Sequence, residues 1–212
     1  MGTGQKLSTF MRFARALRAV GVGTFDPVLF PTLQAAYNAP ERYYHTLAHI
    51  GFCLQALDGV WDECEHPEEI EVALWFHDAV YDPQAQDNEA RSAAWAGDVL
   101  RECEINPDAI ARVENLILAT AHKDPPTSPD QAWIIDIDLA ILGQPETLFA
   151  EYDAAIRREY AWVGDEAYRV GRTAVLDRFL AGPTIYRTSI FQQQYEAQAR
   201  KNLTAARNAL RQ

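Results

Sequence analysis

The chain has 212 residues, 48% of them hydrophobic, which is long enough for one compact domain with a substantial core. Its formal net charge of -11 disfavours binding to nucleic-acid polymers and to anionic membranes, because no basic segment offsets that charge locally. The three cysteines are odd in number and lack CxxC spacing, and no run of about 18 apolar residues predicts a membrane span. We therefore expect a cytoplasmic protein without a disulfide framework.

The first half of the chain shows the apolar periodicity of amphipathic helices. Ser8 is placed to cap the first helix, which continues through Val20. Pro67 and the pair Asn106–Pro107 have the chemistry of later helix starts. After the first helix, the segments expected to be helical are residues 26–37, 45–61, 66–82, 88–103 and 106–123.

The second half continues the helical pattern after a short proline-rich connection at residues 124–130. The segment AWIIDIDLAILG has β-branched content, but it leads into further apolar residues and predicts a buried helix that ends at Gly143. Further helices are expected at residues 145–163, 165–181 and 189–210. The sequence thus predicts a single all-α domain, residues 1–212, of about eight to ten helices. Its motif-bearing core spans about 42–143, and C-terminal helices at 145–212 pack on that core.

Four elements place imidazole or carboxylate groups in apolar surroundings. His45 and His49 are four residues apart, which puts both on one face of a helix. His77 and Asp78 are adjacent in a run of apolar residues, and His122 lies near a helix end. The segment IIDIDLAILG adds Asp136 and Asp138. Imidazole and carboxylate together are ligands for divalent transition metals and magnesium, so the pattern is compatible with a metal site.

A structural interpretation of the same residues stays open at this point. A lone HD pair or a lone aspartate in an apolar helix can be a hydrogen-bonded core group rather than a ligand. The HxxxH spacing of His45 and His49 lacks the glutamate of the HExxH metalloprotease motif, because Thr46 follows His45. The order H…HD…D, with each member in an apolar helical context, favours the metal site.

That order resembles the HD-domain superfamily of metal-dependent phosphohydrolases. The segments RYYHTLAHI, WFHDAVYDP, DNEARSA, ATAHK and DIDLAILG look like the subgroup described as predicted metal-dependent HD phosphohydrolases. The resemblance implies an HD-type helical bundle that holds one or two divalent ions per chain, from Mn, Mg, Fe, Co, Ni or Zn. It implies cleavage of a small phosphomonoester or phosphodiester, for example a nucleotide, by metal-activated water.

The resemblance also implies roles for individual residues. The metal ligands would be His49, His77, Asp78 and Asp138, with Asp136 as the alternative to Asp138 if the register is shifted. His45 matches a proton-donating histidine of related phosphodiesterases, and its structural alternative is a helix-start residue that hydrogen-bonds the backbone.

Four further residues have an implied role beside a local one. His122 matches histidines that bind a second metal or the phosphate, and Glu89 matches an acidic residue that orients water. As local alternatives, His122 is a partly exposed helix-end imidazole, Asn88 is the cap of a helix, and Glu89 suits the first turn of that helix. Arg42 and Lys123 are placed to meet a substrate phosphate or to pair with surface carboxylates.

Two other functions are compatible with the same residues. One is a di-iron HD-type oxygenase, which would need additional ligands such as His45 or His122. The other is a non-catalytic nucleotide-binding domain that retains its metal site. The expected partner in the leading interpretation is a small phosphorylated substrate, which the acidic chain can accept because bound cations reverse the potential in a cleft. The last helix could pack on its own domain or form a homodimer.

Overall fold

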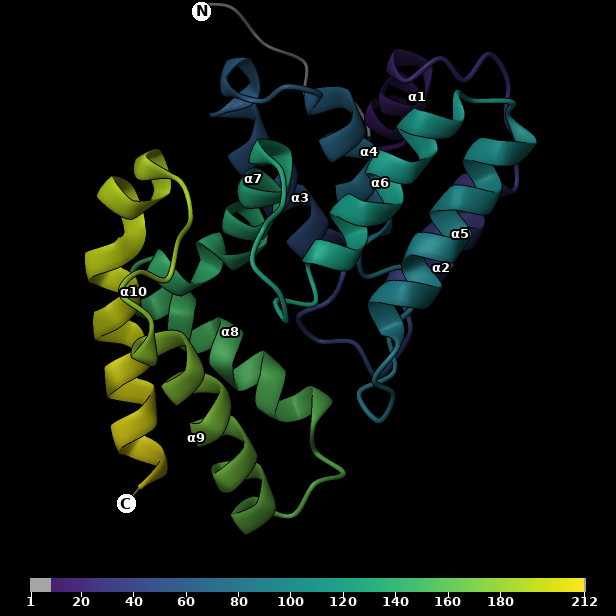
Figure 1. Ribbon diagram of the computed structural model, residues 1–212. Helices are drawn as coiled ribbons and strands as arrows, with labels where there is room; N and C mark the ends of the chain where they lie inside the picture. Colours follow the sequence, from purple (N-terminus) through teal and green to yellow (C-terminus); the bar gives the residue numbers. More distant parts are fainter. Residues whose placement is uncertain (1–8, 212) are drawn as a thin grey trace, which may run out of the picture.

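Figure 1 shows the computed structural model, which describes residues 9–211. Within this range the chain forms ten α-helices and two short 3₁₀ segments, with no β-strand, so the predicted all-α class is confirmed. The expected cap at Ser8 lies outside the described residues. The elements are α1 Thr9–Ala19, α2 Leu29–Tyr37, α3 Leu47–Asp58, η1 Trp61–Glu63, α4 Pro67–Phe76, α5 Asn88–Glu102, α6 Pro107–Ala119, α7 Pro129–Asp138, η2 Leu139–Gly143, α8 Glu146–Glu159, α9 Asp165–Ala181 and α10 Ser189–Leu210.

Helix α4 is the central helix of the N-terminal part because it is buried on every side. All residues from 69 to 76 are buried, and the helix packs against α1, α3, α5, α6 and α7. Its two buried carboxylates are paired, Glu69 with Arg112 and Glu71 with Arg12, each at 2.7 Å. A helix that is enclosed in this way delivers whatever follows its C-terminus into the interior of the fold.

Helix α4 ends at Phe76, earlier than the expected end near Asp82. The apolar pattern continues through Ala79 and Val80, but a distant arginine satisfies the carbonyl groups that a longer helix would use. The guanidinium of Arg42 donates to the carbonyl oxygen of Asp78 at 2.6 Å and to that of Ala79 at 3.0 Å. The chain therefore leaves the helix at the HD pair.

Two other helix starts differ from the sequence prediction because of local capping. Helix α3 begins at Leu47, not at His45, since the hydroxyl of Thr46 accepts a hydrogen bond from the backbone N–H of Ala48. Helix α7 begins at Pro129, inside the expected proline-rich connection, with Ser128 as its N-cap. The predicted cap at Asn106 and the first position at Pro107 are confirmed for α6.

Asn88 has a different local role from the predicted one. It is the first residue of α5 and not its N-cap, which is Asp87. The side chain of Asn88 instead accepts a hydrogen bond from the backbone N–H of Asp82 and donates one to the carbonyl oxygen of the same residue. This pair of bonds closes the loop that follows the HD pair.

The three last helices form a group on one side of the molecule, in green to yellow in Figure 1. Helix α10 runs along η2 and α9, and it contributes Phe191, Ala199 and Leu203 to the core. The side-chain amide of Asn202 donates to the carbonyl oxygens of Leu142 and Gln144, both at 2.8 Å. These contacts attach α10 to the segment that directly follows α7.

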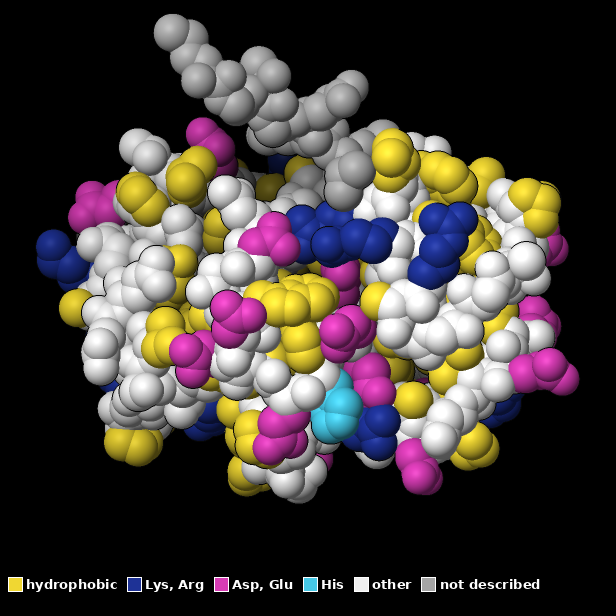
Figure 2. Space-filling view, turned by 90° about the horizontal axis from the view of Figure 1, so that it is seen from above, with side chains coloured by type: hydrophobic (Ala, Val, Ile, Leu, Met, Phe, Trp, Pro, Cys, Tyr) yellow, Lys and Arg dark blue, Asp and Glu magenta, His cyan; other side chains and the backbone are white. Residues whose placement is uncertain are grey.

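The surface is compatible with the acidic composition. On the described part of the face in Figure 2, basic side chains form small groups with acidic side chains around them, and no continuous basic area is visible there. Within residues 9–211, none of the helices combines the length and the apolar character that crossing a bilayer requires.

Candidate metal centre and adjoining cavity

Donor atoms from three helices converge at the end of α4. The Nε2 atoms of His49 and His77 are 3.2 Å apart. Oδ2 of Asp78 lies 3.5 Å from Nε2 of His49 and 3.0 Å from Nε2 of His77. Oδ1 of Asp138 lies 3.1 Å and 3.5 Å from the same two nitrogen atoms. The four residues predicted as metal ligands are thus brought together.

The local structure explains how each donor reaches this point. His49 lies in the first turn of α3, His77 and Asp78 follow the last residue of α4, and Asp138 is the last residue of α7. Both imidazoles are almost fully buried, at 3% exposure for His49 and 1% for His77. The site therefore depends on one helix start and two helix ends that meet inside the fold.

The backbone orients the His77 ring toward the cluster. Its Nδ1 lies 2.9 Å from the carbonyl oxygen of Leu74, a contact in which only a protonated Nδ1 can donate. With Nδ1 protonated, a neutral ring would direct the lone pair of Nε2 to the centre of the cluster, which is the arrangement that a metal-binding histidine requires. Without a cation there, the neighbouring carboxylates favour a proton on Nε2. Burial opposes the protonation of this ring, but Asp78 and Asp138 outweigh it and raise the pKa of His77 well above its ordinary value.

The same cluster holds two carboxylates in a buried place. Burial alone would raise the pKa of Asp138, but hydrogen bonds from His122, His49 and His77 hold it well below its ordinary value. Asp78 behaves similarly, because His77 and His45 offset the effect of its burial and lower its pKa. The cluster therefore keeps both carboxylates ionised and needs positive charge nearby.

A divalent cation fits these residues. Oδ2 of Asp78 is buried and forms no well-oriented hydrogen bond among the described residues, although Nε2 of His77 lies 3.0 Å away, so a cation would satisfy it better. Adjacent ligands of an octahedral ion with bonds of ~2.1 Å stand about 3.0 Å apart, and those of a tetrahedral ion about 3.4 Å. The nitrogen–nitrogen and nitrogen–oxygen separations are 3.0–3.5 Å, close to this range. One donor atom each of His49, His77 and Asp138 lies within 4.8 Å of the other two, so these three residues could hold an ion, and Asp78 lies beside both histidines.

The two aspartates near the end of α7 have separate roles. Asp138 faces the histidines, whereas Asp136 is fully buried on the other side of the helix. The carboxylate of Asp136 accepts hydrogen bonds from the backbone N–H groups of Arg187 and Thr188, both at 2.7 Å. Asp136 thus joins α7 to the start of α10, and Asp138 is the residue that the geometry places in the cluster.

His122 lies next to the cluster in an unusual backbone conformation. Its φ is +52°, in the left-handed region that a residue with a side chain adopts only where the surroundings demand it. Nε2 of His122 lies 2.9 Å from Oδ2 of Asp138, the oxygen that does not face His49. Its Nδ1 is buried without a partner among the described residues. The strained turn after α6 therefore holds this imidazole against a candidate ligand.

His45 lies before α3 and not on the helical face predicted from its spacing to His49. Its Nδ1 is 2.6 Å from Oε2 of Glu159, and its ring stacks on Tyr81 with centroids 4.2 Å apart. Burial by itself would lower the pKa of His45, but Asp78 and Glu159 outweigh this effect and raise the pKa above its ordinary value. Because Glu159 occupies Nδ1, Nε2 is the atom left for other contacts.

Glu159 is a site residue that sequence reasoning missed. It is 4% exposed, and its carboxylate also accepts hydrogen bonds from the backbone N–H groups of Tyr43, Tyr44 and His45 and from the hydroxyl of Tyr81. It stands in the charged segment RREY, more than one hundred residues after His45, and no local pattern distinguishes it from a surface glutamate. Tyr81 is its other side-chain partner.

The remaining predicted residues are distributed between the cavity and its support. Arg42, predicted to meet a substrate phosphate or a surface carboxylate, is 8% exposed and is not part of the cavity wall. It also donates to the carbonyl oxygen of His45, so it joins the backbone segments of His45 and Asp78. Glu89 and Lys123 both line the cavity, Glu89 half-buried and Lys123 exposed. His66, which lies outside the cavity wall, is half-exposed and contacts Asp130.

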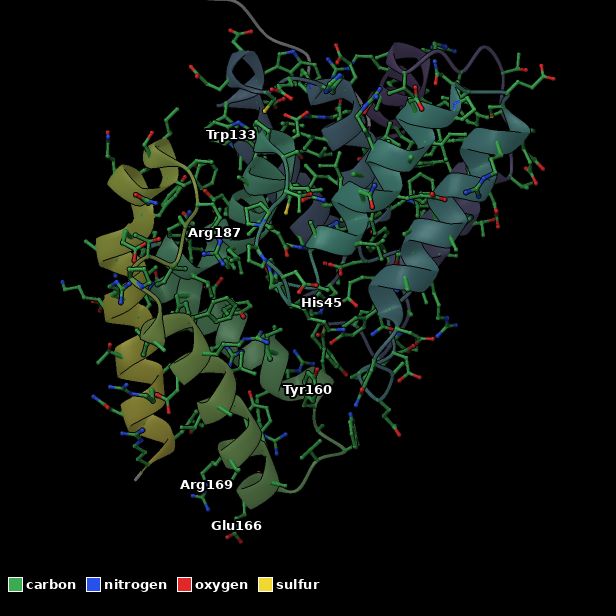
Figure 3. All side chains as sticks on the ribbon, in the orientation of Figure 1. His45, Trp133, Tyr160, Glu166, Arg169 and Arg187 are labelled. Atoms are coloured by element: carbon green, nitrogen blue, oxygen red, sulfur yellow. The ribbon has the colours of Figure 1, made fainter. Side chains whose placement is uncertain are left out.

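A cavity of about 650 Å³ opens beside the cluster. Asp78, Asp138, His45 and His122 form one end of it, and side chains of α8 and α9 form the other. In Figure 3, His45 lies in the space between these two parts of the molecule, with Tyr160 at the near end of α8. The volume is in the range of cavities that hold small organic ligands.

The arrangement thus combines a cation-binding cluster, a histidine held by a buried carboxylate and a cavity that reaches both. Comparison with known proteins adds no family to these observations, because no protein-family model, curated protein or solved structure matches the chain.

Proposed function

We propose that this protein is a metal-dependent phosphohydrolase of the HD type, acting on a small phosphate ester. The observation that carries the proposal is the cluster of His49, His77, Asp78 and Asp138, in which a buried carboxylate oxygen forms no well-oriented hydrogen bond among the described residues. The order of these residues along the chain is the order that the resemblance implies. Their place at one end of a cavity gives a small substrate access to them.

The four residues would hold a divalent ion through two imidazole nitrogens and two carboxylate oxygens. Such an ion supplies positive charge that polarises a phosphoryl group and activates water as a nucleophile. Two imidazoles and two carboxylates leave coordination positions free for substrate. This set of ligands suits Mn, Fe, Co, Ni, Zn or Mg.

His45 is the proton donor of the proposed reaction. Nδ1–H of His45 donates a hydrogen bond to Glu159, and the stack on Tyr81 orients the ring. In the protonated ring, the second proton is therefore available on Nε2. From there it can pass to the oxygen of the leaving alcohol. Glu89, which lines the same cavity, would orient the attacking water, and Lys123 at the cavity wall would meet the phosphate.

The contact between His122 and Asp138 favours one second candidate, a di-iron oxygenase. His122 lies against the outer oxygen of Asp138, so these two residues could contribute ligands to a second ion. Iron retained after aerobic purification, with a visible absorption band, would support this function over hydrolysis.

The first test is elemental analysis of the purified protein beside its Asp78→Ala variant, with Asp98→Ala as the matched control. Asp98 is an exposed carboxylate on α5, remote from the cluster, so its loss leaves any bound metal in place. We expect one or two divalent ions per chain in the wild type and in Asp98→Ala, and none in Asp78→Ala.

The metal found then defines the assay. With that metal bound, release of phosphate from a panel of phosphomonoesters and of alcohol and phosphomonoester from a panel of phosphodiesters is measured, and Asp78→Ala should lose the activity. Absence of metal from the wild type after reconstitution, or full activity in metal-free Asp78→Ala, would contradict the proposal. Tight binding of phosphate esters without turnover in any of the six metals would instead identify a non-catalytic binding domain.

A further inference from the structure

The far wall of the cavity is built from side chains of α8 and α9, which touch each other at Tyr152 with Arg172 and at Tyr160 with Tyr168. Tyr152, Ile156 and Tyr160 recur every four residues along and just after α8 and face the cavity. Helix α9 adds a second row, which consists of Ala167, Tyr168, Gly171, Arg172, Val175, Arg178 and Phe179. Beyond these contacts, the remaining aromatic and aliphatic surface of both rows faces the cavity, where a ligand can cover it.

The wall is rich in aromatic rings, and one inner side chain is unsatisfied. Tyr44 packs edge-on against Tyr152, with centroids 4.6 Å apart, and also contacts His49. Its hydroxyl is buried and has no hydrogen-bond partner among the described residues. Aromatic faces bind flat apolar rings in stacked or edge-on geometry. The wall thus offers ring faces together with one free polar group close to the metal cluster.

Gly171 shows that the open space is built into α9. A glycine inside a helix is less stable than alanine by roughly 0.5–1 kcal/mol. Neighbouring atoms do not require it here, because a Cβ at Gly171 would meet nothing within 4 Å. Gly171 lies in the cavity wall between Tyr168 and Val175. Gly171 is exposed at the cavity wall, so a larger side chain there would take up part of the open space beside the ligand.

Charge at the cavity fits a ligand that also carries an anionic group. Lys123 and Arg178 line the cavity from opposite parts of the molecule and are both exposed. In the described part of the chain, neither forms an ion pair with a carboxylate, whereas Arg172 is paired with Asp153 at 2.7 Å. An anion that enters the cavity would meet these two cations before it reaches the cluster.

We infer that the wall formed by α8 and α9 is the subsite for the alcohol part of the substrate, and that this alcohol carries a flat apolar ring. The inference rests on the proposed function, in which the phosphate group lies at the cluster of His49, His77, Asp78 and Asp138. It adds the substrate class: phosphate esters of ring-bearing alcohols, selected by the aromatic wall and by the space at Gly171.

The test compares two ligands that differ only in a ring. 2-Phenylethylphosphonate and ethylphosphonate, neither of which can be hydrolysed at an ester bond, are titrated calorimetrically into the metal-loaded protein. We expect the phenyl compound to bind wild type about tenfold more tightly or better, which is what burial of a ring of this size gives. Equal affinities, or no binding of either compound, would overturn the inference.

Two variants at neighbouring positions locate the subsite. Gly171→Leu places a side chain in the cavity and should reduce the preference for the phenyl compound to below about threefold. Val170→Leu is the control, because Val170 is 69% exposed and lies outside the cavity wall; it should keep the wild-type preference. Leucine is favourable in helices, so folding is checked by thermal unfolding, and Val175→Trp provides a second way to fill the cavity. An unchanged preference in folded Gly171→Leu and Val175→Trp would place the ring elsewhere.

Hydrolysis separates this inference from the proposed function. 2-Phenylethyl phosphate and ethyl phosphate both release alkyl alcohols, so their intrinsic reactivities are similar. If wild type hydrolyses neither but still prefers the phenyl phosphonate through Gly171, the subsite stands and the hydrolase function fails. If it hydrolyses both equally and binds both phosphonates equally, the hydrolase function stands and the subsite fails.

Discussion

Glu159 determines the local structure around His45 at the scale of single residues. Burial would raise the pKa of this carboxyl, but the hydrogen bond and charge of His45 and the N–H groups of Tyr44 and Tyr43 lower it to about 2. A carboxyl whose pKa is depressed by folding stabilises the native state above its unfolded pKa near 4.3. That contribution is lost as the pH falls through about 2.

We therefore expect Glu159→Gln to be less stable than wild type by about 2 kcal/mol near pH 6, because hydrogen bonds to a charged group are lost. The difference should shrink as the pH falls from about 5 to 2, where the wild-type carboxyl also becomes protonated. Urea unfolding of both proteins across this pH range measures it. Glu166→Gln, at an exposed glutamate of α9, is the control. A difference that stays constant with pH would show that the charge of Glu159 does not contribute.

Sequence reasoning predicted the four clustered residues but missed Glu159, and the reason is physical. Local order and apolar context distinguish His49, His77 and Asp78 from surface residues. The choice of Asp138 over Asp136 depends on which side of α7 meets α3 and which meets α10, and both aspartates have the same local context. Glu159 contacts residues that lie more than one hundred positions earlier in the chain, and rules based on local spacing cannot identify such contacts.

At the scale of helices, two glycines should respond oppositely to the same substitution. A Cβ at Gly143 would overlap Cβ of Tyr195 on α10 and lie 2.9 Å from the hydroxyl oxygen of Tyr186. Gly143→Ala should therefore destabilise the protein by about 1–3 kcal/mol, because α10 must move away. Gly171→Ala should stabilise it by about 0.5–1 kcal/mol, since the Cβ enters open space and alanine favours the helix.

Chemical denaturation with urea compares these two variants with wild type. The slopes of the unfolding transitions should stay equal, so that the shift in midpoint reports stability. A neutral Gly143→Ala would mean that α10 is not closely packed on η2.

Helix identity was predictable to a greater degree than helix ends. The buried helix that ends at Gly143 was expected and is present as α7 followed by η2. The end of α4 was wrong because Arg42, thirty-six residues earlier, satisfies the carbonyl of Asp78. The start of α3 was wrong by two residues because Thr46 is its cap and His45 is held by Glu159 instead. Periodicity contains neither of these contacts.

At the scale of the whole molecule, one core cluster includes residues from α1 through α10. Phe13 and Leu33 belong to it, and so do Leu176, Phe191 and Leu203 from the C-terminal helices. The all-α class followed from periodicity alone, whereas the packing partners of each helix did not, because many amphipathic faces can pair with one another.

We expect the full chain to unfold in a single cooperative transition and a fragment that ends at Gln144 not to fold by itself. The fragment loses the core residues of α8 to α10, the carboxylate of Glu159 and the N–H partners of Asp136. Thermal unfolding followed by circular dichroism measures both. The prediction would be wrong if the fragment melted cooperatively, or if the full chain showed two separate transitions.

The two aspartates of α7 have a mechanical consequence. Asp136 is bonded to the start of α10, and two residues later Asp138 contributes an oxygen to the metal cluster. Because a single helical turn of α7 carries both aspartates, a shift of one carboxylate would also shift the other. A change in the position of α10 would thus act, through Asp136 and α7, on the candidate metal ligand Asp138. The exterior of the C-terminal helices is connected in this way to the candidate metal cluster.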